Sequence, residues 1–210
     1  MFGLFTPRWT RSEIAFSAGF VALLLLLGAA GEPLRDLLRF DRAAIGAGEW
    51  WRLLSCHFVH LGAGHLWLDT LGLALLLLFF RDVFSPRDWA ITVLAGVVAV
   101  GVALWLRDPQ LSRYVGISGV LHTMLFAGLL LSFRYNPVIN GVVFAAMAGR
   151  LWTEQQPGYD VYYLADSIGG AVMVNAHLYG ALASLPVVLL LWRSSQARQR
   201  QFRGLTTVTE

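Results

Sequence analysis

Residues 116–133 read GISGVLHTMLFAGLLLSF, an apolar run that opens with a serine between two glycines. About 20 apolar residues cross the hydrocarbon core of a bilayer, with some tolerance for tilt and local thinning. The run therefore predicts a membrane-spanning helix with Ser118 and His122 in its first turns. Because a polar side chain inside a span is costly, both residues become candidates for function.

Similar runs occupy most of the chain. The 210 residues are 57% hydrophobic, with a mean hydropathy of +0.60, which exceeds what one soluble core of this length requires. The sequence predicts an all-α membrane protein, with one six-helix domain over residues 1–192 and a polar cytoplasmic tail over 193–210. The expected spans are approximately 14–30, 65–80, 89–106, 116–133, 137–152 and 168–192. We expect the first run to be retained, because no clear small-x-small cleavage pattern follows it.

The basic residues are all arginines, and they stand between the apolar runs. With an inner amino terminus, nine arginines fall on the inner side and seven on the outer side, where they share loops with acidic residues. The positive-inside rule then places both termini in the cytoplasm. The net charge of +3 does not indicate nucleic acid as a partner, because the arginines form no single stripe. The lipid bilayer is the expected surrounding.

Polar residues in three of the predicted spans lie at one depth. The second span carries His65 and Asp69 in its first turns, and the sixth carries His177 about two turns in. Both spans enter the membrane from the same side as the span of Ser118. Any one of these residues has an ordinary explanation, such as a serine bonded back to its own helix. Their shared depth favours one site in the outer half of the bundle.

Small residues indicate which spans approach each other. Glycine and alanine faces let membrane helices pack backbone to backbone. Such residues flank both Ser118 and His177, namely Gly116, Gly119, Ala176 and Gly180. The fourth and sixth spans should therefore touch.

Ser118 and His177 form a candidate nucleophile and base. Serine is a weak nucleophile until a base within hydrogen-bond reach takes its proton, and histidine suits that task near neutral pH. A tetrahedral intermediate also needs donors to its oxyanion. The backbone N–H of Ser118 and the side chain of His65 are the candidates. Gly116 and Gly119 would let a substrate backbone come close.

Several short motifs occur in a characteristic order along the chain. Residues 116–119 (GISG) resemble the GxSG motif of the rhomboid family of intramembrane proteases, and residues 176–180 (AHLYG) resemble its AHxxG motif. His60 and His65 fit the histidine-rich start of that family's second span. Residues 49–52 (EWWR) resemble the Trp-Arg element of its first loop.

This resemblance covers roughly residues 14–192, and it implies a dyad of Ser118 and His177 without a third, acidic member. It implies cleavage of a membrane-anchored protein substrate in or near its spanning segment. It also implies an oxyanion site built from the serine N–H, the second-span histidine, here His65, and an asparagine four residues later. We expect no cofactor and no metal.

Two positions depart from the family's pattern. Position 69 is aspartate, and an ionised carboxylate would repel an oxyanion. Asp69 is therefore either protonated and a donor, or it orients or charges His65 and donates nothing. Four residues after the serine, His122 replaces the aromatic residue that is frequent there. His122 shares a helix face with Ser118, so it either stacks on His177, which we favour, or competes with it as the base.

The combination of GxSGxLH with AHLYG most resembles the rhombosortase subgroup of bacterial rhomboids. That subgroup is associated with proteins that carry a C-terminal Gly-Gly motif, a hydrophobic span and a short basic tail. The resemblance implies a bacterial inner membrane protein whose active site lies toward the periplasm. The alternatives are a general rhomboid protease with other single-span substrates, an inactive client-binding relative, and a small transporter that uses His65, Asp69 and His177 as a proton relay.

Three further features have mostly structural interpretations. His57 and His60, together with His65, do not predict a metal site, because no second group of ligands lies at a matching depth. Arg150 and Glu154 are spaced as an i, i+4 pair, which we interpret as a snorkelling ion pair at the interface or, less favoured, as a contact with substrate. The stretch 155–170 predicts a loop over the site.

Overall fold

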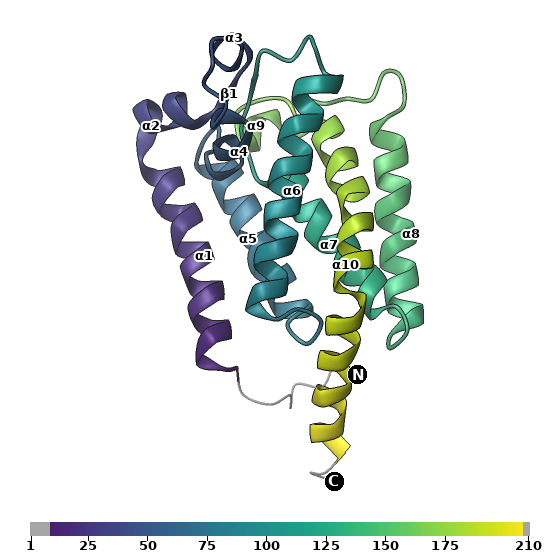
Figure 1. The fold of residues 1–210 in the computed structure, drawn as a ribbon. Helices are drawn as coiled ribbons and strands as arrows, with labels where there is room; N and C mark the ends of the chain where they lie inside the picture. Colours follow the sequence, from purple (N-terminus) through teal and green to yellow (C-terminus); the bar gives the residue numbers. More distant parts are fainter. Residues whose placement is uncertain (1–8, 208–210) are drawn as a thin grey trace.

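The computed structural model describes residues 9–207 and consists mainly of packed helices (Figure 1). The long helices are α1 (Arg11–Ala29), α5 (Ala63–Phe79), α6 (Pro86–Arg107), α7 (Ser118–Ser132), α8 (Pro137–Glu154) and α10 (Val174–Thr207). The short elements are α2 (Gly31–Leu38), β1 (Phe40–Asp41), α3 (Arg42–Gly46), α4 (Arg52–Ser55), the 3-10 helix η1 (Cys56–Phe58), β2 (Arg113–Tyr114) and α9 (Ala165–Ile168). Helix α1 begins and α10 ends at the same end of the bundle, opposite the end where α2, α3 and α4 gather.

Within the described residues, three helices are long and apolar enough to cross a membrane: α1, α6 and the Val174–Gln201 part of α10. Residues Arg52–Phe58 together with α5, bent by 89° at a short break, would make a fourth. Helix α7 is apolar but has only 15 residues. The structure thus supports the prediction of a helical membrane protein, while the number of six spans stays a prediction.

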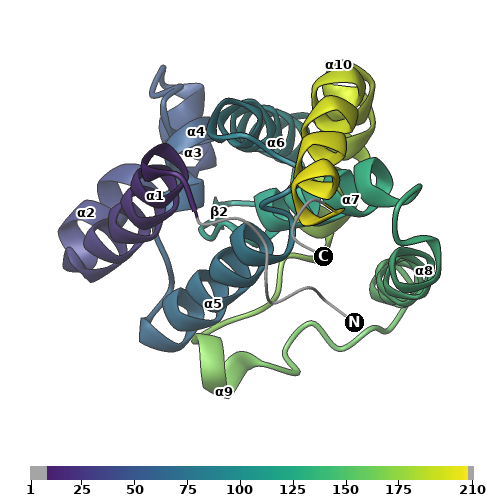
Figure 2. The same cartoon turned by 90° about the horizontal axis from the view of Figure 1, so that it is seen from below.

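Helix α7 is the central helix of the bundle. It contacts α5, α6, α8 and α10, and the view along the bundle shows α1 and α8 on opposite sides of it (Figure 2). Its apolar side chains enter the main core, where Met124 belongs to the same cluster of buried residues as Leu73 of α5 and Val97 of α6. A serine at the start of such a helix is consequently surrounded by other helices.

Helix α10 differs from the predicted sixth span at both ends. It begins at Val174 and not at 168, because α9 ends in the left-handed residue Gly169 and an irregular segment follows. It also continues through Thr207, so the predicted polar tail is helical up to there. Gln196 and Gln199 are buried and donate to the Leu131 carbonyl at the end of α7, at 3.1 and 3.2 Å. These bonds satisfy a carbonyl that a helix end leaves free.

A two-residue antiparallel ladder, which the all-α prediction lacked, ties the first loop to the chain just before α7. Phe40 pairs with Tyr114, and Asp41 pairs with Arg113. Beside it, Arg42 donates to four backbone carbonyls around the end of α6, those of Leu104, Trp105, Asp108 and Leu111. Residues 31–62 therefore pack on the bundle, and they hold the chain segment that leads into Ser118.

Candidate active site

Ser118 and His177 meet where α7 and α10 touch. Ser118 is the first residue of α7, and His177 lies in the first turn of α10. The Ser118 Oγ and the His177 Nε2 are 3.1 Å apart, which is a hydrogen-bond distance. His177 is buried, while Ser118 is partly exposed. A serine and a potential base thus share a hydrogen bond between two helices that are distant in sequence.

Glycines allow this close approach. A Cβ atom on Gly180 would lie 1.8 Å from the Gly119 carbonyl oxygen, and one on Gly119 would lie 2.8 Å from the Ala176 carbonyl oxygen. No real side chain fits at such distances, so the two backbones are in direct contact. The small residues beside Ser118 and His177 are therefore what brings the pair together.

His122 stacks on His177. The two rings have centroids 4.3 Å apart and planes inclined by only 17°. The His122 Nδ1 lies 2.8 Å from the Ser118 carbonyl oxygen, and an acceptor there requires the proton on that nitrogen. His122 therefore covers one face of the His177 ring, and His177 is the histidine that contacts the Ser118 hydroxyl. Of the two arrangements that the sequence left open for His122, the structure has the stacked one.

Glu154 contacts the other edge of the His177 ring. Its Oε2 lies 3.0 Å from the His177 Nδ1, and its Oε1 accepts from the Arg150 Nε at 2.9 Å. The Glu154 side chain is fully buried, whereas that of Arg150 is 43% exposed. The Arg150–Glu154 pair was expected, but its interpretation as an interface ion pair was incomplete. A dyad without an acidic neighbour, which the resemblance implied, is not what the structure shows.

Asp69, on α5, accepts a hydrogen bond from the backbone just before Ser118. Its Oδ2 accepts from the Ile117 N–H at 3.1 Å and lies 3.2 and 3.3 Å from the Nε2 atoms of His60 and His65. The His65 Nδ1 accepts from the Leu61 N–H, which assigns the proton of a neutral His65 to Nε2, facing Asp69. The Ile117 N–H and the His65 Nε2–H are thus able to donate, and Asp69 is arranged as an acceptor.

The backbone before Ser118 is held from several sides. Gly116 has φ +116°, and a Cβ atom there would lie 2.7 Å from the His65 ring. Its N–H donates to the Cys56 carbonyl at 3.0 Å, and its own carbonyl accepts from the Tyr114 hydroxyl at 2.7 Å. Glycine is required here because other residues avoid this φ and have a Cβ. The loop therefore presents Ser118 in one fixed position.

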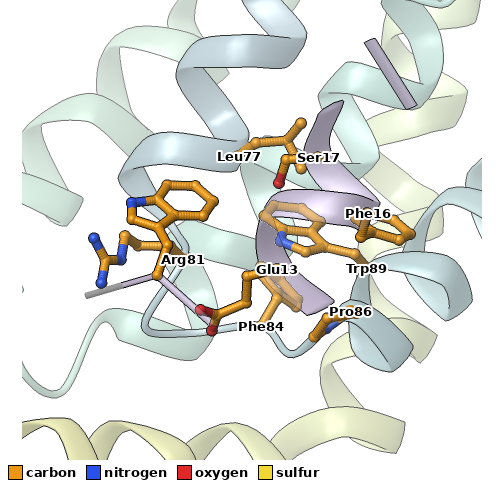
Figure 3. A pocket seen from close by; sticks show the side chains of 9 residues that line it. Glu13, Phe16, Ser17, Leu77, Arg81, Phe84, Pro86 and Trp89 are labelled. Carbon is orange, nitrogen blue, oxygen red and sulfur yellow. The ribbon is translucent and has the colours of Figure 1, made fainter. Parts of the chain in front are cut away.

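A small cavity lies elsewhere, between the starts of α1 and α6 and the end of α5 (Figure 3). Its volume is about 10 Å³, at the lower limit for one water molecule. Glu13 lines it and is paired with Arg198 and the Thr10 N–H. This cavity is a small gap in the packing of the helices, and the candidate catalytic residues lie around Ser118.

The fold and this geometry define an integral membrane protein of packed helices, with a serine and a histidine in hydrogen-bond contact between two of them. The model of the rhomboid domain family matches residues 47–194, which is most of the chain. The protein therefore belongs to the rhomboid family, whose members are generally intramembrane serine proteases.

A similar protein is "RHOMBOID-like protein 5" of Arabidopsis thaliana, which is 35% identical over 107 residues. The match covers 50% of this chain and 34% of that protein, so the chain spans about a third of the relative's length. The likeness supports the family, and the activity of this chain is argued from its own residues.

Proposed function

We propose that this protein is an intramembrane serine endopeptidase that cleaves the membrane anchor of a protein substrate. The observation that carries the proposal is the 3.1 Å contact between the Ser118 Oγ and the His177 Nε2. The membership of the rhomboid family supports it. A transporter or a client-binding relative has no need of a serine held against a histidine by two glycines.

In the proposed reaction, the Ser118 Oγ attacks the scissile carbonyl carbon while its proton passes to the His177 Nε2. The carbonyl oxygen becomes an oxyanion, and the first-turn N–H groups of α7, which have no partner within the helix, are placed to receive it. His177 then gives its proton to the leaving amine as the peptide bond breaks. Water or an amine releases the acyl group from Ser118 and completes the cycle.

Asp69 has a supporting part in this proposal. Its Oδ2 accepts from the Ile117 N–H, one residue before the nucleophile, and faces His60 and His65. We assign it to holding the start of α7 and orienting His65, which leaves the oxyanion to other donors. This is the second of the two roles that the sequence left open.

The proposed substrates are proteins with a C-terminal Gly-Gly motif, a hydrophobic span and a basic tail, as for a rhombosortase. The GxSGxLH and AHLYG motifs support this choice. General single-span substrates are the alternative. We further propose a location in the bacterial inner membrane with both termini in the cytoplasm. The distribution of the arginines supports this orientation, as does the position of the start of α1 and the end of α10 at the same end of the bundle. Ser118 then faces the periplasmic half.

The proposal is tested with the full chain reconstituted in liposomes beside a single-span substrate that carries the Gly-Gly tail. The wild-type protein should cleave it and react at Ser118 with a fluorophosphonate probe, while Ser118→Ala and His177→Ala should do neither. A matched substrate without the Gly-Gly motif separates the two substrate classes. Cleavage by Ser118→Ala would refute the mechanism, and an inert, unlabelled wild type would favour a client-binding relative. The mass of the new C-terminus tells whether water or an amine is used.

A further inference from the structure

We propose that Glu154 is a positioning residue for His177, so that the site works as a Ser118–His177–Glu154 triad. This inference rests on the proposed roles of Ser118 and His177. It adds a residue from α8, a helix that the implied dyad does not use.

The first argument is the protonation of the histidine. The His177 ring is contacted on both nitrogens, by the Ser118 Oγ at Nε2 and by the Glu154 Oε2 at Nδ1. An ionised carboxylate can only accept, so the proton of a neutral His177 lies on Nδ1. The lone pair of Nε2 then faces the Ser118 hydroxyl. This is the tautomer that a general base requires, and the other tautomer could not take the proton.

The second argument is burial. A buried carboxylate is costly unless each oxygen has a partner. Both oxygens of Glu154 have one, Arg150 on Oε1 and His177 on Oε2. A snorkelling pair at the interface would leave the carboxylate in contact with water, yet only Arg150 is substantially exposed. Arg150 therefore offsets the charge of Glu154, and Glu154 is directed at the histidine.

The third argument is the change during the reaction. When His177 takes the proton of Ser118 it becomes a cation, and its bond to Glu154 becomes charge-assisted and stronger. The titratable groups facing His177 are Ser118 and His122 on α7 and Glu154 on α8, with Arg150 behind the carboxylate. Of these, only Glu154 is able to offer a negative charge to the imidazolium while Ser118 is the attacking group. The carboxylate thus favours the transition state over the resting state.

The arrangement also includes a residue outside the helices. Arg150 donates to the Tyr163 hydroxyl, which lies in the connection between α8 and α10. His177 is held by the Ser118 Oγ at Nε2, by the Glu154 carboxylate at Nδ1 and by the His122 ring on one face. A catalytic group held this way needs little reorganisation before reaction.

The test compares Glu154→Ala and the isosteric Glu154→Gln with a matched control, Asp108→Asn. Asp108 also holds the start of α10, through Asn175 and through the Tyr179 hydroxyl at 2.8 Å, but it does not touch His177. We expect Glu154→Ala to lower kcat by roughly 10²- to 10⁴-fold with KM little changed, as for loss of general-base function. Glu154→Gln should fall between Glu154→Ala and the wild type, and the control should stay near the wild type.

A second measurement does not depend on turnover. In protein labelled with 15N-histidine, the wild-type His177 should show the Nδ1–H tautomer, identified by comparison with His177→Ala, and Glu154→Ala should show a mixture of tautomers. An unchanged tautomer together with an unchanged kcat would overturn the role of Glu154 while leaving the dyad intact. An equal fall of kcat in Asp108→Asn would also overturn it, because loosening of α10 would then explain the loss. Cleavage by Ser118→Ala would instead reject the protease function itself.

Discussion

The carbonyl oxygen of Gly119 faces Gly180 so closely that a Cβ atom on Gly180 would lie 1.8 Å from it. The atom it would meet is backbone, and neighbouring backbone cannot move aside as a flexible side chain can. We expect Gly180→Ala to force α7 and α10 apart, with a loss of about 3 kcal/mol of folding free energy, the upper end for overpacking. The Ser118–His177 contact should be lost with it, so activity should vanish as well.

The matched control for Gly180→Ala is Gly149→Ala. Gly149 lies inside α8, and nothing lies within 4 Å of a Cβ atom built there. Because alanine is a better helix former than glycine, this variant should be as stable as the wild type or slightly more stable. Thermal unfolding in detergent compares the two. If both variants melt like the wild type, the close contact of the two backbones is not needed for the fold.

His122 gives a prediction about its ring. We expect His122→Phe to keep activity within a few-fold of the wild type, because a phenyl ring preserves the stacking on His177. His122→Ala should lose roughly tenfold, because His177 loses the support on one face. Fluorophosphonate labelling rates of Ser118 measure both. If His122 were instead the base, His122→Phe would be inactive and His177→Ala would retain activity.

Much of this site was accessible from the sequence because its residues belong to regular helices. Ser118 and His122 are one helical turn apart, so their common face follows from spacing alone. The positions of His65 and His177 near the starts of two apolar runs indicated their depth. These predictions required only helix geometry and the direction in which each span crosses.

Glu154 was not accessible in the same way. Its spacing from Arg150 indicated an ion pair, but the 19 residues between α8 and α10 contain irregular segments and the short helix α9. The helical period of α8 cannot be extended across such a connection, so the sequence does not tell which face of α8 meets His177. The helical continuation of α10 was not predicted for a related reason. In the sequence, polar residues such as Gln199 resemble an exposed tail, because only the structure shows the Leu131 carbonyl to which Gln199 donates.

Asp69 gives a prediction about its role as a hydrogen-bond acceptor. Its Oδ2 accepts from the Ile117 N–H and faces the Nε2 of His65. In Asp69→Asn the amide oxygen can take the position of Oδ2 and accept from the same groups, but as an uncharged acceptor it forms weaker hydrogen bonds than a carboxylate does. We therefore expect Asp69→Ala to lower the labelling rate of Ser118 by at least roughly tenfold, since a buried group left unpaired costs about 1–3 kcal/mol, and Asp69→Asn to lower it less.

The control for Asp69 is Asp36→Asn, which removes an exposed carboxylate paired with Arg39 near the first loop. It should label like the wild type. Near-normal labelling in Asp69→Ala would contradict the acceptor role, because the groups that face Asp69 would then not need an acceptor.

Asp41 gives a prediction about acid stability. It caps α3 and lies outside the expected spans; burial raises its pKa, but the hydrogen bond from the Ala44 N–H and the charges of Arg39 and Arg113 outweigh burial and lower the pKa from its ordinary 3.8. A carboxyl with a lower pKa in the folded state stabilises the fold above its unfolded pKa, and this contribution disappears as the pH falls through the folded pKa. The melting temperature of Asp41→Asn should therefore lie below that of the wild type at neutral pH, and the difference should close in acid. A difference that stays constant as the pH falls from neutral into strong acid would show that the carboxylate charge is not its source.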